Sequence, residues 1–177
     1  MKQIYCIFHA TSVNKDKNKF ITQSQLRIMT ERNRTKHVDI LKQGVAVWND
    51  WNKKHPTTIP QLQHTDLRGC VLRGVKLQRA DLTGANLQRV NLRAARLQNA
   101  ILRSANLRSA DMRGADLTGA DLSDCDLRQV ILVDTNLSSA KLNNAFVYGI
   151  AAWKYLGTHP FFGLPSSSRA ILAVFQH

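Results

Sequence analysis

Leucine returns at every fifth position through the middle of this chain, and no other feature constrains the fold as strongly. Seventeen successive places five residues apart, from Leu62 to Leu142, hold sixteen leucines and Met112. On an α-helix a step of five residues rotates by about 140°, which would spread these side chains around the whole cylinder. On a continuous strand an odd step alternates between the two faces. Neither regular structure buries these leucines on one side.

The other places of the five-residue unit indicate how it folds. The residue two before each leucine is small or compact, as at Ala80, Val90 and Cys125. The residue just before it is often Asp or Asn, whose side chains bond to nearby backbone groups at turns. Glycine occurs at the fifth place, as at Gly84 and Gly119, where a corner needs conformational freedom. We predict short extended segments with the leucine and the small residue inside and a turn after every fifth residue.

Residues 80–84 and 115–119 both read ADLTG, and the pattern resembles the pentapeptide-repeat family, A(D/N)LXX. The resemblance covers residues 60–147. It implies an all-β solenoid, a right-handed quadrilateral β-helix with four repeats per coil and about four coils. Each coil of such a solenoid is stabilised by stacking on its neighbours.

The regions on either side of the repeats are expected to cap the solenoid, because a bare coil exposes an apolar interior and strand edges. Upstream, residues 35–59 are assigned to a cap and linker, with one amphipathic helix over residues 36–54. The helix is indicated by apolar residues three or four apart. These residues are Val38, Leu41, Val45 and Trp48.

The two chain ends give weaker signals. Residues 1–34 are polar, and we expect them to be disordered. Residues 148–177 are assigned to a C-terminal cap and tail. The aromatic stretch 146–153 resembles the segment that closes the repeats in some relatives, and the resemblance implies an end-to-end homodimer through this end.

The chain is strongly basic, with a formal net charge of +13. Residues 1–59 carry 11 Lys or Arg and 4 acids, whereas residues 60–146 carry 12 and 8. Such a balance permits attraction to nucleic acid, acidic proteins or anionic lipid without choosing among them. The sequence has no apolar run long enough for a membrane span and no secretory signal pattern. We therefore expect a cytoplasmic protein that does not enter a membrane, with reduced thiols at Cys6, Cys70 and Cys125.

With four repeats per coil, residues twenty apart stack in columns, and two outward columns on adjacent faces are rich in arginine. One column holds Arg73, Arg93 and Arg113 and ends at Val133; the other holds Arg68, Gln88, Arg108 and Arg128. The columns indicate either a surface for phosphate or an acidic partner, or a solvated face that keeps the rod soluble. Without interleaved aromatic residues they do not indicate stacking on single-stranded nucleic acid.

No set of residues with catalytic, metal-binding or cofactor-binding spacing is evident. His64 is the only histidine of the repeats, and no Ser-His-Asp set is evident within them. Asp81 and Asp121 share a column but would lie two coils, or about 10 Å, apart, and corner-forming carboxylates explain them. Cys70 and Cys125 stand at inward places and substitute for alanine. We expect no enzymatic activity and no cofactor.

The fold and the missing catalytic set favour a non-catalytic interaction or scaffold module that presents a rigid surface to a protein partner. The alternative is a nucleic-acid-associated or topoisomerase-modulating protein that uses the charged faces. Some members of the resembling family mimic DNA and block topoisomerases, which requires a negative face. Here the repeats lack Glu and carry a net +4, which disfavours direct DNA mimicry.

Overall fold

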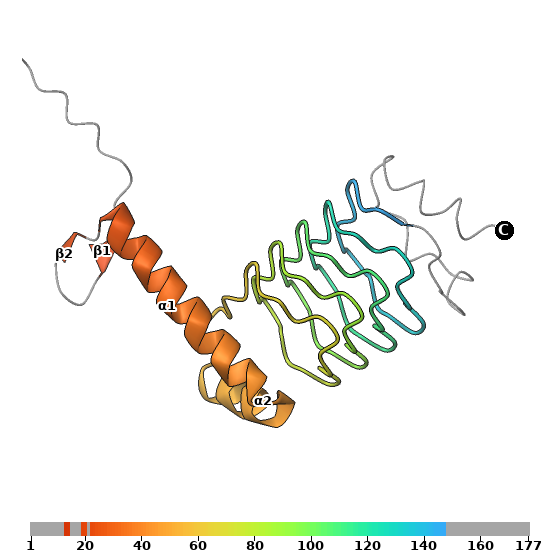
Figure 1. Cartoon of the computed structure of the whole chain (residues 1–177), viewed down its shortest axis with the longest axis horizontal. Helices are drawn as coiled ribbons and strands as arrows, with labels where there is room; N and C mark the ends of the chain where they lie inside the picture. Colours follow the sequence, from red (N-terminus) through yellow and green to blue (C-terminus); the bar gives the residue numbers. More distant parts are fainter. Residues whose placement is uncertain (1–12, 15–18, 21, 148–177) are drawn as a thin grey trace, which may run out of the picture.

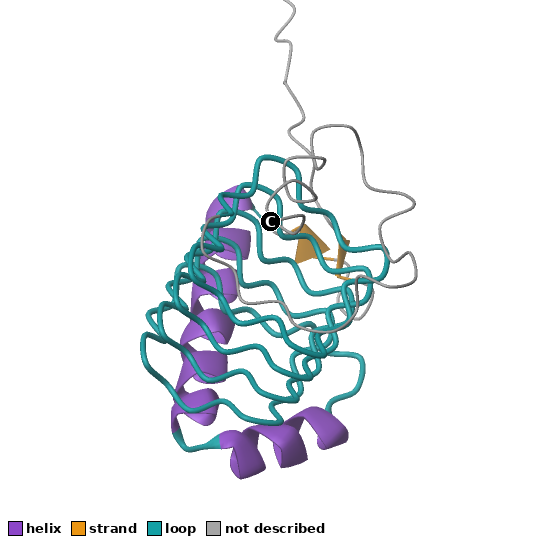
Figure 2. Cartoon of the chain, turned by 90° about the vertical axis from the view of Figure 1, so that its right-hand side faces the viewer, coloured by secondary structure: helices purple, strands orange, loops and turns teal. Residues whose placement is uncertain are grey.

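A computed structural model of the chain describes residues 13–14, 19–20 and 22–147 (Figure 1). Strands β1 (Val13–Asn14) and β2 (Lys19–Phe20) pair antiparallel near the start. Helices α1 (Gln23–Lys42) and α2 (Val45–Lys54) follow, and a four-sided coil then stacks on itself to form a rod. Figure 2 looks toward the end of the rod and shows the four sides of the coil.

Every repeat of the rod ends in a tight turn of one kind. In the turn after Leu82, the N–H of Ala85 donates to the carbonyl of Leu82 at 2.9 Å. The fifth place has positive φ at all seventeen corners, for example 64° at Gly84 and 53° at Ala94. Positive φ at the third residue alone is the sign pattern of a type II turn. The predicted corner at the fifth place is confirmed.

The coils are joined by parallel backbone hydrogen bonds between residues about twenty apart. The N–H of Leu92 donates to the carbonyl of Asp111 at 2.7 Å, and the N–H of Asp111 donates back to Val90 at 2.9 Å. The same pattern makes bridges from Asp81 to Ile101 and from Ile101 to Asp121. The predicted coil of four repeats is therefore confirmed. Asp81 and Asp121 lie two coils apart in one column, with Ile101 between them, as expected.

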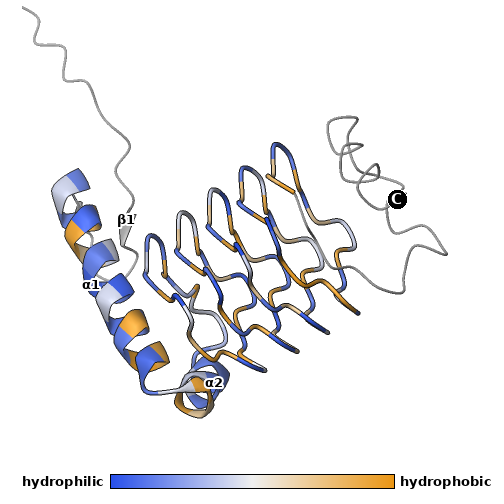
Figure 3. Cartoon of the chain, turned by 45° about the vertical axis from the view of Figure 1, so that its right-hand side comes forward, coloured by the Kyte–Doolittle hydropathy of each residue, from blue (hydrophilic) through white to orange (hydrophobic). Residues whose placement is uncertain are grey.

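The interior of the rod is filled by the leucines and the small residues between them. Leu97 and Met112 are fully buried, as are Ala80 and Ala120. Figure 3 shows apolar and polar segments alternating along each coil. This alternation follows from the repeat, because the leucine and the small residue are separated by one outward residue.

Helix α2 covers part of the first coil and uses side chains in place of a preceding coil. Trp48 is fully buried, and its Nε1 donates to the carbonyl of Lys76 at 2.7 Å. Asn49 donates to the carbonyl of Gly74 at 3.0 Å and accepts the N–H of Lys76 at 2.8 Å. Asn52 also donates to the Lys76 carbonyl, at 2.8 Å. These contacts satisfy backbone groups that would otherwise form an open edge.

Helix α1 covers a second part of the same edge with its C-terminal half. The Nδ1 atom of His37 accepts the N–H of Gln61 at 3.0 Å, and Arg34 donates to the carbonyl of Gln63 at 3.1 Å. His37 and Leu41 are buried. The N-terminal half of α1 projects away from the rod (Figure 1).

The expected single helix over residues 36–54 is wrong. Gly44 separates two helices, because its φ of 119° lies outside the helical region. Residues with a side chain rarely adopt this φ, which glycine tolerates. The expected disorder of residues 1–34 is wrong for residues 23–34, which belong to α1. That helix begins with a capping box in which the Thr22 hydroxyl accepts the N–H of Gln25 and the Gln25 side chain accepts the N–H of Thr22.

The predicted C-terminal cap and tail, 148–177, and the homodimer through that end fall outside the described residues. Within the described part of the chain, no helix combines the length and the apolar character needed to cross a membrane.

The packing of His37 predicts that the cap weakens in mild acid. Burial lowers the pKa of His37 below its ordinary value of 6.5, and the nearby charges of Lys36 and His55 lower it further. The unfolded chain therefore binds this proton more readily, so the free energy of unfolding should fall as the pH drops below about 6.5. Urea unfolding followed by tryptophan fluorescence at pH 7.5 and 5.5 measures the effect.

The control for this prediction is His37→Gln, which keeps an acceptor for the Gln61 N–H but does not titrate. This variant should lose the pH dependence that His37 causes in that interval. An equal loss of stability in the wild type and in His37→Gln would contradict the prediction.

Candidate interaction surface

The structure brings the six predicted arginines together as two columns. The bridges 66–86–106–126 and 71–91–111–131 run two places before the outward arginines and fix their stacking. We name the two sets the first Arg column and the second Arg column. The first Arg column consists of Arg68, Arg108 and Arg128, and the second consists of Arg73, Arg93 and Arg113. They lie on adjacent faces, because consecutive repeats are separated by one corner.

Three of these arginines are paired with a carboxylate of their own repeat. Arg113 donates from Nε and from a terminal nitrogen to the two oxygens of Asp111, at 2.9 and 2.6 Å. Arg128 binds Asp126 in the same way, at 2.8 and 2.6 Å. The third pair, Arg68 with Asp66, has a shortest contact of 2.7 Å. Each is a two-point guanidinium–carboxylate contact, the geometry that planar groups favour.

The main effect of these ion pairs is on the local charge of the surface and not on the free energy of unfolding. The Arg128 guanidinium holds the pKa of the Asp126 carboxyl below its usual value, and Arg68 does the same for the pKa of Asp66. Both carboxylates therefore remain ionised at neutral pH. Because exposed ion pairs contribute little net free energy, the main result is local neutralisation of the arginines.

Arg93 is paired across coils instead of within its own repeat. Its Nε donates to Asp111 at 2.8 Å, so Asp111 serves Arg93 and Arg113 at once. The residue two before Arg93 is Asn91, which leaves Arg93 without an acid in its own repeat. Four of the six predicted arginines thus contact a carboxylate. The sequence does not predict the pairing of Arg93 across coils.

Arg73 and Arg108 differ from the other four. The residue two places before Arg73 is Val71, and the residue two places before Arg108 is Asn106. Asn106 accepts only the backbone N–H of Arg108, at 3.1 Å. Within residues 22–147, neither guanidinium has a hydrogen-bond or ion-pair partner. These two side chains are the cations of the columns that are free to bind another molecule.

A further cation, Arg89, stands at the corner between the two Arg columns and was missed by the sequence analysis. It is exposed, with φ of 57°. The signal was available, because the fifth place holds glycine in other repeats and a long charged residue there must point outward. Arg79 and Arg96 are also exposed, on another face of the rod.

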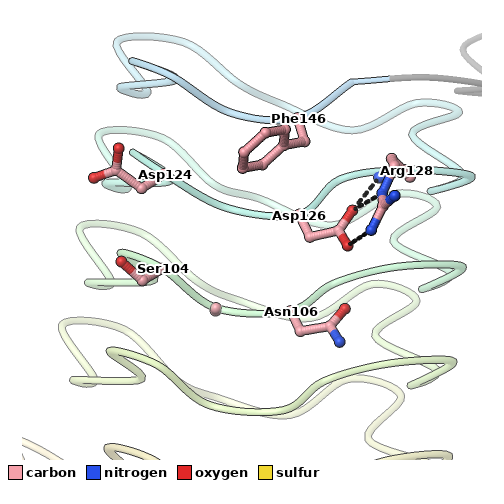
Figure 4. A pocket seen from close by; sticks show the side chains of 7 residues that line it. Ser104, Asn106, Asp124, Asp126, Arg128 and Phe146 are labelled. Atoms are coloured by element: carbon pink, nitrogen blue, oxygen red, sulfur yellow. Dashed lines mark hydrogen bonds and ion pairs between the residues drawn. The ribbon is translucent and has the colours of Figure 1, made fainter.

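A shallow groove lies beside the first Arg column near the last described coil (Figure 4). Its volume is about 270 Å³, and its lining includes Ser104, Asp124, Asp126 and Phe146. Phe146 takes the outward place above Asp126 in the same column and is 63% exposed. Asp126 is already held by Arg128, and Asp124 accepts a hydrogen bond from Asn144 at 3.2 Å.

The described residues offer little for covalent or metal chemistry. They contain no group of three His, Cys, Asp or Glu side chains placed to hold a metal ion. Cys125 is buried, and burial raises the pKa of its thiol to about 12, so it stays protonated. Its sulfur donates to the carbonyl of Leu102 at 2.8 Å. Cys125 thus acts as a small core residue.

The model of the protein family described as "Pentapeptide repeats" matches residues 61–93, 85–124 and 120–149, which together make up half of the chain. The chain belongs to the pentapeptide-repeat family. Members of this family form a right-handed quadrilateral β-helix, and the four-sided coil with a period of twenty residues is that fold.

Solved structures of pentapeptide-repeat proteins resemble this chain. One from the cyanobacterium Cyanothece 51142 is 32% identical with a TM-score of 0.51, over 52% of this chain and 63% of that protein. One from Nostoc PCC 7120 is 30% identical with a TM-score of 0.45, over 61% and 94%. QnrB1, a plasmid-mediated fluoroquinolone resistance protein, is 19% identical with a TM-score of 0.34, over 54% and 56%.

The chain therefore spans less than two thirds of the length of the Cyanothece protein. No curated protein matches the chain.

The ion pairs predict that removing acids should expose a basic surface. The triple variant Asp66→Asn, Asp111→Asn and Asp126→Asn frees four arginines of the two columns. Asn keeps the acceptor for the turn, as Asn86 and Asn106 do in the same column as Asp66. The variant should elute from heparin at higher salt than the wild type, because more cations can contact the polyanion.

The matched control is Asp81→Asn, Asp116→Asn and Asp121→Asn, which changes the net charge equally on faces without the Arg columns. It should shift the elution salt less. Equal shifts for the two triple variants would show that net charge alone governs retention.

Proposed function

We propose that this pentapeptide-repeat rod is a non-catalytic interaction module that presents its two Arg columns to an acidic surface of a protein partner. The observation that carries the proposal is the pairing pattern of the columns. Arg73 and Arg108 are free, and the arginines around them are held in place by carboxylates. A partner would meet cations and anions at fixed places on a regular backbone.

The regular spacing of the columns supports recognition by fixed geometry. Coils stack about 4.8 Å apart, so outward groups of one column repeat at that interval. The guanidiniums held by Asp111 and Asp126 lose little further freedom when a partner binds. Because every outward group is attached to a hydrogen-bonded coil, binding does not require the backbone to become ordered.

The mixture of charges favours a protein over a nucleic acid as partner. Asp66, Asp111 and Asp126 lie beside the arginines that would otherwise contact phosphates, and each carboxylate repels a phosphate. A protein surface can present both signs of charge and match such a pattern, which gives specificity. A nucleic acid backbone presents only negative charge.

A double charge reversal tests the proposal. Arg73→Glu with Arg108→Glu reverses the two free cations of the columns, whereas Arg79→Glu with Arg96→Glu changes the net charge equally on another face. Tagged wild type and both variants are used to capture proteins from the native cell extract. An acidic protein should be retained by the wild type and by the Arg79/Arg96 variant, and lost with the Arg73/Arg108 variant. Capture that is unaffected by the Arg73/Arg108 variant would refute the proposal.

The second candidate is a nucleic-acid-associated or topoisomerase-modulating protein. It is supported by the excess of seven positive charges in residues 1–59 and by exposed cations on the projecting half of α1, such as Arg27 and Arg32. DNA binding that falls steeply with salt, together with a changed rate in a supercoiling assay, would favour this candidate. No retention on DNA at low salt would remove it.

A further inference from the structure

The two cap helices leave half of the first coil's edge uncovered. α1 satisfies backbone groups at Gln61 and Gln63, and α2 satisfies groups at Gly74 and Lys76. Between these points, the backbone groups of residues 66–73 that point away from the second coil meet no capping side chain. We name residues 66–73 the open edge. It runs along two faces of the rod and around the corner between them.

The open edge carries six backbone groups that are hydrogen bonded at the equivalent places of the second coil. There, Asn86 donates to Thr65 and accepts from Leu67, and Asn91 does the same with Cys70 and Leu72. In the first coil the corresponding groups have no partner among the described residues. They are the N–H groups of Asp66 and Val71 and the carbonyls of Asp66, Arg68, Val71 and Arg73.

The side chains beside the open edge are exposed and mostly basic. Val71 is 71% exposed, the largest exposure among the large hydrophobic side chains of residues 22–147. Arg73 has no partner there, and Arg68 is held by Asp66. Lys42, at the end of α1, is close enough to lower the pKa of Asp66. The local charge is therefore positive around one apolar side chain.

We propose that the open edge binds an acidic, extended segment of a partner protein, which adds a parallel strand to the first coil. The inference rests on the proposed function, since it assigns a place on the rod and a chemistry to a protein partner. Unpaired N–H and carbonyl groups in a row form a template for strand addition. The positive side chains select the charge of the segment.

Two alternative occupants of the open edge, the chain's own N-terminal segment and a second copy of the chain, are disfavoured by charge or by shape. The chain's own residues 1–21 hold four lysines and one aspartate, and so carry the same sign as the open edge. A second copy meeting edge to edge would bring Arg68 and Arg73 against their own equivalents. The cap helices also stand on the same end of the rod, which hinders such an approach (Figure 1).

The geometry of the rod specifies the segment further. To follow both faces it must turn with the left-handed conformation seen at all corners of the rod, which Gly and Asn adopt readily. Acidic residues placed just after its inward side chains would stack over Arg68 and Arg73, since equivalent places of successive coils lie in one column. An apolar residue over Val71 would cover its exposed side chain.

The test uses the full chain and a ten-residue peptide, Ala-Asn-Leu-Glu-Gly-Ala-Val-Leu-Glu-Gly, whose two Glu lie over Arg68 and Arg73 and whose Val lies over Val71. The control peptide, Ala-Asn-Leu-Lys-Gly-Ala-Val-Leu-Lys-Gly, replaces each Glu by Lys. At saturating acidic peptide, hydrogen exchange of the Asp66 and Val71 amides should slow by about tenfold or more, because both become bonded. The lysine peptide should leave both amides unchanged. Unchanged exchange with the acidic peptide, or protection elsewhere only, would overturn the inference.

Three variants sharpen the test by fluorescence anisotropy of the labelled peptide. Val71→Pro removes a donor that the rod does not use and should weaken binding. Arg73→Glu should weaken it about three- to tenfold, whereas Arg108→Glu, which reverses the other free cation two coils further along, should change it by less than about twofold. Equal effects of Arg73→Glu and Arg108→Glu would place the peptide on the columns and overturn the inference.

A thermal melt by circular dichroism checks that Val71→Pro folds. If this variant does not fold, the effect of Arg73→Glu on peptide binding tests the inference alone.

The two proposals can fail separately. If the open edge binds no peptide but capture of a protein still depends on Arg108, the edge inference fails and the proposed function stands. If the edge binds the peptide while capture ignores the Arg columns, the columns are not the partner surface.

Discussion

The backbone ladder between successive coils is the interaction on which the rest of the structure depends. Each coil reaches its neighbours only if the chain bends after every fifth residue, and the bend requires positive φ. Twelve of the seventeen corner residues are not glycine, and Arg89 and Ala94 are among them. An isolated residue with a Cβ avoids this conformation by roughly 1–2 kcal/mol. Stacking therefore imposes the corner, and the identity of the corner residue assists it only in part.

The same repeat that builds the rod also sets its charges. An outward Asp two places before an outward Arg lies on one face with it, so the pattern brings a carboxylate and a guanidinium together, as in Asp126 and Arg128. A free cation appears where the pattern is interrupted and no carboxylate of the next coil takes its place, as Asp111 does for Arg93. Val71 replaces the acid before Arg73, and Asn106 replaces it before Arg108. In a regular repeat the Asp neutralises the Arg two places later. Both functional proposals therefore rest on the interruptions, and the strand-addition proposal also rests on the incomplete cap.

The sequence predicts the rod well because its repeat is geometric. Leucines five apart exclude helix and continuous strand, and the period of twenty places Asp81, Ile101 and Asp121 in one column, as the bridges confirm. The two Arg columns follow from the same arithmetic. The closeness of Asp and Arg within one repeat follows as well, but the pair between coils, Arg93 with Asp111, does not, because it depends on side-chain conformations.

The sequence predicts the N-terminal cap less well than the rod, because the cap depends on a helix break and on contacts that leave little pattern in the sequence. Apolar residues at helical spacing continue across Gly44, so the pattern indicates one helix where the backbone breaks. The first half of α1 is exposed and has little amphipathic signal, although Thr22 and Gln25 form a capping-box pattern that marks its start. The partial cover of the first coil has no sequence signal, because it depends on which edge groups Asn49 and His37 reach.

The central claim, that twenty residues make one coil held to its neighbours by a backbone ladder, is tested most directly by comparing two deletions in urea unfolding. Removing residues 86–105 joins Ala85 to Asn106 and keeps every later leucine in phase. This variant should unfold cooperatively, at a lower midpoint because one stacking interface is lost. Removing residues 86–103 puts the later leucines out of phase and should abolish the cooperative transition. Equal stability of the two variants would contradict the account.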